Sequence, residues 1–348
     1  MSVEVIDIQT FVASSTPGQI IDVRSPAEFA EGHIPGAVNI PLFSNDERAE
    51  VGTTYKQVGP KEAFALGLDR VGPKLSHFIA EAEKLTDSGA LRIYCWRGGK
   101  RSQSMGWLLQ QAGLKPVVLH GGYKAFRRHA HQMMEEPMKL LVVGGNTGSG
   151  KTEILKELQK RGEQVIDLEG LANHRGSAFG AIGLPPQPSN EQFLNLVWQA
   201  WDGLDRSRPI WLEDESRSIG KVTVPDALFQ KMQQCTTLAI EAPMPLRIGH
   251  LMALYGSQAV EELEASLLKI QKRLGGRDTQ QALEDLKAGN LRAVTERLLL
   301  YYDKLYHHSL HRRGDHLITH LTLDPPPTSW DAWLKQAADK LQGADDNG

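Results

Sequence analysis

Residues 139–152 read Lys-Leu-Leu-Val-Val-Gly-Gly-Asn-Thr-Gly-Ser-Gly-Lys-Thr, and this stretch decides the fold of the second half of the chain. Its first residues form an apolar run typical of a buried strand, and the residues from Glu153 to Lys160 predict a helix. The segment between them satisfies the pattern G-x-x-x-x-G-K-[ST], with a strand before it and a helix after it. This context predicts a phosphate-binding loop.

The loop supplies the residue types that a phosphate site needs. Its glycines let backbone N–H groups approach phosphate oxygens, Lys151 reaches the terminal pair of phosphates, and the Thr152 hydroxyl suits Mg²⁺. The predicted binding residues are Gly145, Asn146, Thr147, Gly148, Ser149, Gly150, Lys151 and Thr152. Such a loop grips a diphosphate unit without specifying a nucleotide, so any diphosphate ester is chemically admissible.

Two later strands are predicted to end in acidic residues. Residues 164–169 read Gln-Val-Ile-Asp-Leu-Glu, and residues 209–215 read Pro-Ile-Trp-Leu-Glu-Asp-Glu. An acid at the carboxyl end of the second of these strands is placed to bind Mg²⁺ or to orient a nucleophile, and Asp214 is the predicted metal ligand together with Thr152. The alternative is an acidic strand end that only faces solvent.

Two arginines near these strands are candidates for contacts to phosphate. Arg175 lies in a small, cationic and flexible segment, Asn-His-Arg-Gly-Ser-Ala-Phe-Gly at residues 173–180, which has the composition of a loop that covers a substrate. Arg217 follows directly after the acids of the third strand. Ordinary surface positions are the alternative for both residues.

A second chemical motif stands earlier in the chain, at residues 94–102, Tyr-Cys-Trp-Arg-Gly-Gly-Lys-Arg-Ser. The predicted strand Leu91 to Tyr94 comes before it, and apolar residues at helical spacing follow it. Two glycines and a helix N-terminus, with Arg97 and Arg101, form a cradle for an anion. A Cys95 thiol in this cradle is expected to be ionised near neutral pH. We therefore take Cys95, Arg97 and Arg101 as the predicted catalytic residues.

Two other interpretations of this loop stay open. Cys95 could be an inert buried cysteine, although the polar and cationic loop argues against it. Cys95 to Arg101 also spells Cys-x5-Arg followed by Ser102, which is the spacing of a phosphatase loop. Tyr94 stands where many such phosphatases carry histidine, and the second half of the chain gives a phosphatase no obvious use.

The sequence around this cysteine resembles the rhodanese domain family. Residues 21–29, Ile-Asp-Val-Arg-Ser-Pro-Ala-Glu-Phe, and residues 32–41, Gly-His-Ile-Pro-Gly-Ala-Val-Asn-Ile-Pro, are similar to the early signature of that family. Residues 119–126, Leu-His-Gly-Gly-Tyr-Lys-Ala-Phe, resemble its closing strand, turn and helix. The resemblance implies that Cys95 carries a chalcogen as a persulfide does. Asp22 and Arg24, just past a predicted strand, are interpreted either as a buried ion pair that braces the loop or as a turn-fixing pair.

Length and composition favour two globular domains. The chain has 348 residues, of which 41% are hydrophobic and 23% charged, enough for a core in each half. We predict an α/β protein: a rhodanese-like parallel-sheet domain at 1–134, with a helical insertion between Phe43 and Glu83, and a P-loop NTPase-like α/β domain at 138–342 with a helical, partly basic extension. Only two cysteines, no apolar leader and no long apolar segment predict a cytoplasmic protein with neither a disulfide framework nor a membrane span.

The region from Pro243 to His311 predicts helices, with Val294, Leu298, Tyr302 and Leu305 on one apolar face. It also gathers cations and aromatic residues, a combination that suits an RNA backbone and exposed bases. These residues are Lys272, Arg273, Arg277, Arg292, Arg297, Arg312, Arg313, Tyr301, Tyr302 and Tyr306. The net charge of −3 means that any nucleic acid must bind on a local basic surface of this kind.

Taken together, the motifs resemble the bacterial tRNA 2-selenouridine synthase family over about half the chain. Besides the cysteine and phosphate loops, residues 167–177, Asp-Leu-Glu-Gly-Leu-Ala-Asn-His-Arg-Gly-Ser, and residues 213–217, Glu-Asp-Glu-Ser-Arg, match this family. The resemblance implies two steps on the wobble uridine of tRNAs of the Lys, Glu and Gln type. Geranyl diphosphate first alkylates the 2-thio sulfur, and selenium from selenophosphate then replaces the geranylthio group. Competing interpretations are a sulfurtransferase fused to an ATP-dependent small-molecule kinase, and a non-catalytic redox or phosphate sensor.

Overall fold

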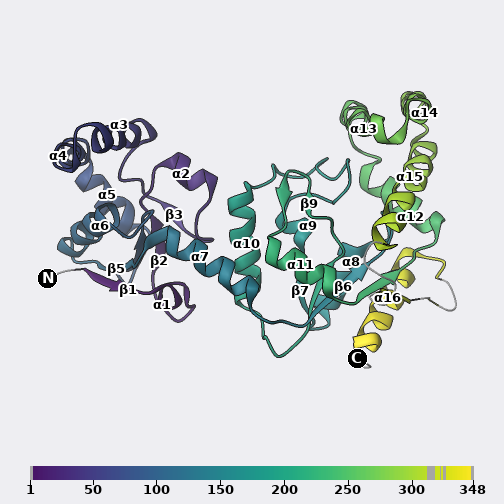
Figure 1. The fold of residues 1–348 in the computed structure, drawn as a ribbon, viewed down its shortest axis with the longest axis horizontal. Helices are drawn as coiled ribbons and strands as arrows, with labels where there is room; N and C mark the ends of the chain where they lie inside the picture. Colours follow the sequence, from purple (N-terminus) through teal and green to yellow (C-terminus); the bar gives the residue numbers. More distant parts are fainter. Residues whose placement is uncertain (1–2, 312–317, 322, 324–326, 346–348) are drawn as a thin grey trace. The chain divides into compact units, whose positions relative to one another are not determined.

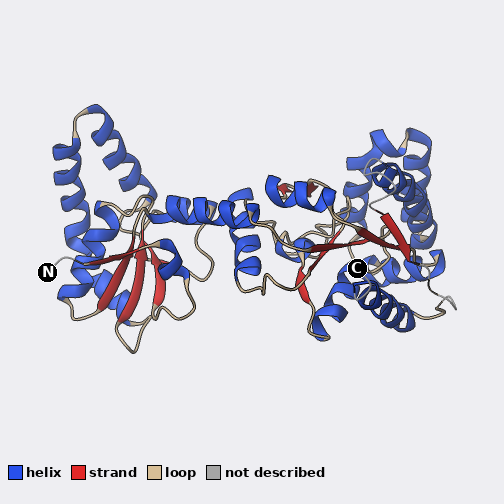
Figure 2. Cartoon of the chain, turned by 60° about the horizontal axis from the view of Figure 1, so that its bottom comes forward, coloured by secondary structure: helices blue, strands red, loops and turns tan. Residues whose placement is uncertain are grey.

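The computed structural model describes residues 3–311, 318–321, 323 and 327–345. The chain divides into two compact units, each with its own sheet: residues 1–133 with 194–198, and residues 134–193 with 199–348. Figure 2 shows the strands of each sheet side by side with helices around them. Among the described residues, no helix combines the length and the hydropathy needed to cross a bilayer. Arg312 and Arg313, part of the predicted RNA surface, lie outside the described residues.

The first unit is built on a five-stranded parallel sheet with the order β1-β5-β4-β2-β3. Its strands are β1 (Glu4–Ile6), β2 (Gln19–Asp22), β3 (Val38–Asn39), β4 (Ala90–Tyr94) and β5 (Lys115–Leu119). The neighbouring strands β4 and β2 lie inside the sheet, and their Ile93 and Ile21 are fully buried. Because the strands are parallel, their carboxyl ends meet at one edge, which places Asp22 and Cys95 on the same side of the sheet.

Helices surround the sheet of the first unit, and three of them begin at side-chain caps. The helices are α1 (Ile8–Val12), α2 (Pro26–Glu31), α3 (Asn45–Gln57), α4 (Pro60–Val71), η1 (Gly72–Lys74), α5 (Leu75–Glu83), α6 (Lys100–Gln111) and α7 (Gly122–Glu135). Ser25 and Ser44 each form a capping box, at the start of α2 and α3 respectively. The predicted helical character of the insertion is confirmed by α3, α4 and α5.

The second unit has a parallel sheet with the order β12-β11-β6-β8-β7. Its strands are β6 (Leu140–Gly144), β7 (Gln164–Ile166), β8 (Ile210–Glu213), β11 (Thr237–Ile240) and β12 (Ile318–Leu321), and a separate hairpin is formed by β9 (Ser218–Ile219) and β10 (Val222–Thr223). The phosphate-loop strand β6 is central, and all five of its residues are buried. The loop that follows β6 therefore starts from the most rigid part of the unit.

The helices of the second unit include a separate helical extension. The helices are α8 (Lys151–Lys160), α9 (Leu168–Leu171), α10 (Asn190–Asp202), α11 (Asp226–Gln234), α12 (Met244–Tyr255), α13 (Val260–Leu274), α14 (Gly276–Lys287), α15 (Leu291–His311) and α16 (Trp330–Asp345). Figure 1 shows α12 to α15, in green, gathered together. They share an apolar cluster with Phe179 and Ile182 of the segment that precedes α10. The predicted α/β class with two parallel sheets and a helical extension is confirmed.

Two details of the sequence interpretation are wrong. The strand predicted at 164–169 ends at Ile166, because Asp167 caps the short helix α9 with its carboxylate. Leu305, predicted on the buried face of its helix, is 45% exposed, whereas Val294 and Leu298 are buried.

Candidate active sites

The cysteine loop joins β4 to α6 and buries its thiol. Cys95 is 3% exposed, and its Sγ lies 3.2 Å from the hydroxyl of Ser102 in the first turn of α6. The Ser102 hydroxyl is also within 3.2 Å of the Gly99 carbonyl. Ser102 is therefore placed to exchange a proton or a hydrogen bond with the sulfur, a role that the sequence interpretation did not assign.

Backbone N–H groups at the start of α7 hold the cysteine loop by hydrogen bonds. The N–H of Tyr123 donates to the Cys95 carbonyl at 2.8 Å, and the N–H of Lys124 donates to the Trp96 carbonyl at 3.0 Å. This close approach needs glycine on both sides, because Gly98 and Gly122 have φ of 66° and 60°. A Cβ on Gly122 would lie 2.3 Å from the Cys95 carbonyl oxygen. The loop geometry therefore depends on a segment that is distant in sequence.

Replacement of Gly122 by alanine is expected to destabilise the first unit by about 3 kcal/mol or more, since it adds a steric clash to the strain of a left-handed residue. Gly113→Ala is the matched control, because Gly113 also has a positive φ, 89°, but a Cβ there meets nothing within 4 Å. We expect it to cost about 1 kcal/mol. Denaturant unfolding measures both, and equal losses would show that the contact with Cys95 is unimportant.

A buried ion pair lies beside the loop. The side chains of Asp22 and Arg24 are fully buried and joined by several hydrogen bonds, the shortest at 2.6 Å. The guanidinium carbon of Arg24 also lies 3.9 Å from the centre of the Tyr123 ring. The backbone N–H of the same Tyr123 donates to the Cys95 carbonyl. The structure favours the interpretation that this pair braces the cysteine loop, because Arg24 contacts Tyr123, the residue that binds the loop. A pair that only fixed a turn would not need this contact.

The two predicted catalytic arginines, Arg97 and Arg101, differ in exposure and in ion pairing. Arg97 is exposed, but Arg101 pairs with Glu28, with Nη1 2.8 Å from Oε2. Burial alone would raise the pKa of Glu28, yet the hydrogen bond and charge of Arg101 lower it overall. Much of the charge of Arg101 is thereby neutralised. Glu28 was absent from the sequence interpretation because it lies 73 residues away from Arg101.

The phosphate loop wraps between β6 and α8 with its polar groups turned inward. Gly148 and Gly150 have φ of 78°, which only glycine adopts without strain. Ser149 is 1% exposed, and its Oγ has no hydrogen-bond partner among the described residues. Lys151 Nζ donates to the Gly145 carbonyl at 3.1 Å. A buried hydroxyl without a partner in such a loop suits a phosphate oxygen.

The helical extension and the last helix hold this loop from outside. Arg247 Nε donates to the Thr147 carbonyl at 2.9 Å, and its guanidinium pairs with Asp303 of α15. The Gly145 N–H donates to the Tyr306 hydroxyl at 2.7 Å, and Trp333 donates to the Ser149 carbonyl at 2.8 Å. The extension is thus part of the phosphate site.

Some residues of the predicted RNA surface also make contacts within the protein. The Tyr306 hydroxyl accepts a hydrogen bond from the phosphate loop, and the Tyr302 hydroxyl accepts one from the Ala178 N–H. Arg297 pairs with Asp278 and Asp285. The RNA surface itself stays a prediction.

Acidic side chains gather between the phosphate loop and β8. The Thr152 hydroxyl donates to Glu169 Oε2 at 2.9 Å, and the buried Glu213 accepts hydrogen bonds from the N–H groups of Leu168 and Glu169. Burial and the charge of Glu169 raise the pKa of Glu215 well above its usual value. Glu169 is therefore the carboxylate nearest the predicted Mg²⁺ ligand Thr152, and the acidic end of residues 164–169 was the signal for it.

Glu213→Gln is expected to stabilise the chain more at high pH than at low pH. Burial, with the charges of Asp167 and Glu169, raises the pKa of Glu213 well above 4.5. Because the unfolded chain releases this proton near pH 4.5 and the folded chain retains it, stability falls as pH rises from there toward the raised pKa. Glutamine cannot titrate, so its gain in melting temperature should grow by several degrees, about 3 °C or more, between about pH 5 and pH 8.

The exposed Glu262→Gln is the control for that measurement, since no burial opposes its charge. The measurement is thermal unfolding at the two pH values. The interpretation fails if the change in melting temperature caused by Glu213→Gln is the same at both pH values, as we expect for Glu262→Gln.

The remaining predicted ligands lie at several places around the loop. Asp214 follows β8, and its N–H donates to the Val143 carbonyl at 2.8 Å. Arg175 donates to the Ile182 carbonyl and lies over the Tyr255 ring at 5.9 Å. Arg217 pairs with the exposed Asp226 at 2.6 Å. The structure brings Thr152 and Glu169 together, and it places Arg217 in a surface ion pair.

These oxygen donors fit Mg²⁺ in the manner usual for phosphate sites. Among the residues that the structure describes, no group of three or more His, Cys, Asp or Glu side chains is arranged to hold a metal. Mg²⁺ needs only one or two protein ligands when substrate phosphates and water complete its shell. The Thr152 hydroxyl, with the nearby Glu169 carboxylate, provides such ligands.

Comparison with known proteins agrees with this geometry. The family described as tRNA 2-selenouridine synthase AAA domain matches residues 138–325, and the rhodanese-like domain family matches residues 11–129. The tRNA 2-selenouridine synthase of Nitrosomonas europaea is 33% identical, covering 88% of this chain and 92% of its own. That of Bdellovibrio bacteriovorus is 36% identical, covering 84% and 89%.

One solved structure is also similar over part of the chain. The crystal structure of the N-terminal domain of a putative ATP/GTP binding protein from Clostridium difficile is 41% identical, covers 36% of this chain and 98% of its own, and superposes with a TM-score of 0.34. The family matches confirm the predicted pairing of a rhodanese-like domain with a P-loop domain. The chain therefore belongs to the tRNA 2-selenouridine synthase family, and it is an enzyme of selenium-dependent tRNA modification.

Proposed function

We propose that this chain converts 2-thiouridine at the wobble position of tRNA into 2-selenouridine in two steps, with geranyl diphosphate and selenophosphate as co-substrates. One observation carries the proposal: a buried thiol in a strand-to-helix loop and a phosphate loop with a buried, unpartnered serine hydroxyl occur in one chain of this family. A sulfurtransferase alone needs only the first of these sites. Both are used when a diphosphate ester prepares the nucleoside for exchange of its chalcogen.

In the first step the 2-thio sulfur forms a bond to the first carbon of the geranyl chain. The bond from that carbon to the diphosphate oxygen breaks, and the uridine releases its N3 proton to water. Lys151 and the N–H groups of the phosphate loop bind the departing diphosphate, and Thr152 with Asp214 or Glu169 would hold Mg²⁺. Bound Mg²⁺ would neutralise part of the charge on the leaving group.

In the second step selenium from selenophosphate bonds to C2 of the base. The geranylthio group leaves as geranylthiol, N3 regains a proton, and water takes up the phosphoryl group as phosphate. We assign Cys95 to positioning the selenium beside C2, with no bond between its sulfur and the selenium, and Arg97 and Arg101 are the cations of its loop. Ser102, 3.2 Å from the sulfur, is placed to hold a proton during this exchange.

The RNA substrate fits both steps. The wobble uridine lies in the single-stranded anticodon loop, so its base is accessible without opening a duplex. The resemblance to the family points to tRNAs of the Lys, Glu and Gln type. We propose that these tRNAs are the partners of the chain.

Reconstitution with purified components tests the proposal. A tRNA that carries 2-thiouridine and no selenium is incubated with the chain and geranyl diphosphate, and then with selenophosphate. Its nucleosides are analysed by mass spectrometry after each step. We expect S-geranyl-2-thiouridine first and 2-selenouridine second. Unchanged nucleosides together with ATP-dependent phosphorylation of a small molecule would favour the fused kinase instead.

A further inference from the structure

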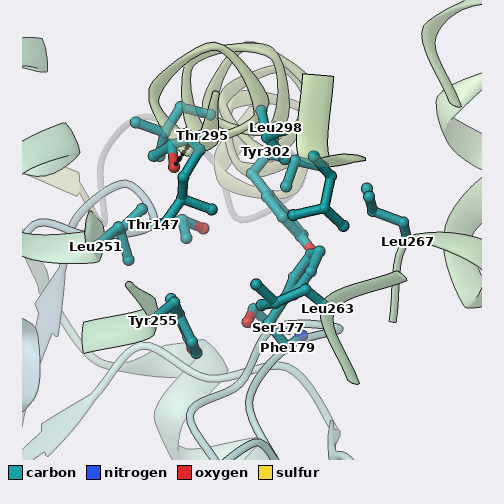
Figure 3. A pocket seen from close by; sticks show the side chains of 14 residues that line it. Thr147, Ser177, Phe179, Leu251, Tyr255, Leu263, Leu267, Thr295, Leu298 and Tyr302 are labelled. Atoms are coloured by element: carbon teal, nitrogen blue, oxygen red, sulfur yellow. Dashed lines mark hydrogen bonds between the residues drawn. The ribbon is translucent and has the colours of Figure 1, made fainter. Parts of the chain in front are cut away.

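An apolar cavity lies against the phosphate loop, and the two steps proposed above give it no role. It encloses about 510 Å³ of space between atoms, part of it open to solvent. Its walls come from the phosphate loop through Thr147, from the segment before α10 through Ser177 and Phe179, and from α12, α13, α14 and α15. Figure 3 shows Thr147 and Leu251 on one side of the cavity and Leu267 on the opposite side.

The cavity continues directly from the loop. Thr147 belongs to the loop and to the cavity wall, and a Cβ on the neighbouring Gly148 would lie 3.0 Å from the Leu251 side chain. Leu251 is itself a wall residue. A ligand whose diphosphate binds the loop would therefore have its next atoms at the mouth of an apolar space.

Three polar side chains of the wall already make hydrogen bonds. The Tyr302 hydroxyl accepts a hydrogen bond from the Ala178 N–H, and the Thr295 hydroxyl donates to the Leu291 carbonyl. Ser177 Oγ accepts from the Phe179 N–H. A nucleobase would bring donors and acceptors that find few partners here, and an unpaired polar group is costly to bury. A hydrocarbon chain has no such cost.

We infer that this cavity holds the prenyl chain of the diphosphate co-substrate, with the diphosphate on the phosphate loop and the chain running from Thr147 toward Leu267. The inference rests on the proposed function and adds the place and class of the second half of that substrate. The walls are mostly leucine, valine and aromatic side chains, as in other sites for apolar ligands. The helical extension is then the part of the fold that selects a prenyl diphosphate over a nucleotide.

The length of the bound chain should be set at the end away from the loop. Leu267 is fully buried, in the cluster that closes the cavity, and its neighbour Leu268 on the same helix is 42% exposed. A larger side chain at Leu267 takes up space inside the cavity, and the same change at Leu268 points to solvent. The two positions therefore form a matched pair.

The experiment compares the affinities of the full chain for geranyl diphosphate and for inorganic pyrophosphate, both with Mg²⁺. Each methylene removed from water is worth about four-fold in affinity, so we expect the native chain to prefer geranyl diphosphate by about ten-fold or more. Leu267→Phe should reduce this preference by about ten-fold with the pyrophosphate affinity kept within about two-fold. Leu268→Phe should leave both affinities unchanged.

A second variant decides the matter if Leu267→Phe does not fold. Phe179→Leu widens the cavity and should shift the preference from geranyl toward the longer farnesyl diphosphate by about five-fold, whereas Phe229→Leu, on α11 and outside the cavity, should not. The inference is overturned if the native chain produces S-geranyl tRNA but these cavity variants keep its ligand preferences. Absence of S-geranyl product from the native chain would instead refute the proposed function itself.

Discussion

Cys95→Ser is expected to abolish incorporation of selenium and to leave S-geranylation of the tRNA largely intact. Serine has nearly the same size, so the loop should keep its contacts with Tyr123 and Lys124. Its hydroxyl remains protonated at neutral pH and does not position the selenium, so we expect the second step to fall by about 10³-fold or more. The measurement is the yield of 2-selenouridine and of S-geranyl-2-thiouridine by mass spectrometry of digested tRNA.

Cys235→Ser is the control, because it changes the only other cysteine of the chain. Burial raises the pKa of the Cys235 thiol, which keeps it neutral and unreactive. This variant should retain both products. Loss of both products in Cys95→Ser, with Cys235→Ser active, would show that the thiol also takes part in geranylation and that the division between the two sites is wrong.

Lys151→Ala is expected to have the opposite pattern and to reduce S-geranylation by about 10²- to 10³-fold. The ammonium group lies in the phosphate loop, within 3.1 Å of the Gly145 carbonyl, where it would meet the charge that develops on the departing diphosphate. Selenation should survive when the tRNA is supplied already S-geranylated. The assay measures each step separately with the appropriate tRNA.

Lys156→Ala tests whether the loss comes from the loop or from the charge of the helix. Lys156 lies on the same helix α8 but is exposed. It should keep at least about half of the native rate, because an exposed charge contributes little at a distance. S-geranyl product at the native rate in Lys151→Ala would refute the role given to the phosphate loop.

The features that could be predicted are those whose parts are neighbours in the sequence. The strand, loop and helix around Cys95, and those around Lys151, are contiguous, so apolar spacing and glycine placement indicated them directly. The same local logic missed α9, because Asp167 reads as the end of a strand until its carboxylate is seen to cap a helix.

Contacts between distant residues were beyond the sequence. Arg101 looked like a free cation for the cysteine loop, but Glu28 pairs with it. Tyr302 and Tyr306 are predicted RNA contacts, and their hydroxyls also accept hydrogen bonds from Ala178 and from the phosphate loop. No spacing rule relates partners that lie 73 to 161 residues apart, since only the packing of the chain brings them together.

The sequence by itself indicated the two parallel-sheet domains, the thiol loop and the phosphate loop, because alternating strand and helix patterns and the placement of glycines can be read from consecutive residues. The tertiary structure alone decided that Glu169 contacts Thr152 and that Arg247 and Tyr306 hold the phosphate loop. It also decided that four helices enclose an apolar cavity beside that loop. Those features are made by side chains from separate elements, and burial of their apolar faces fixes which of them meet.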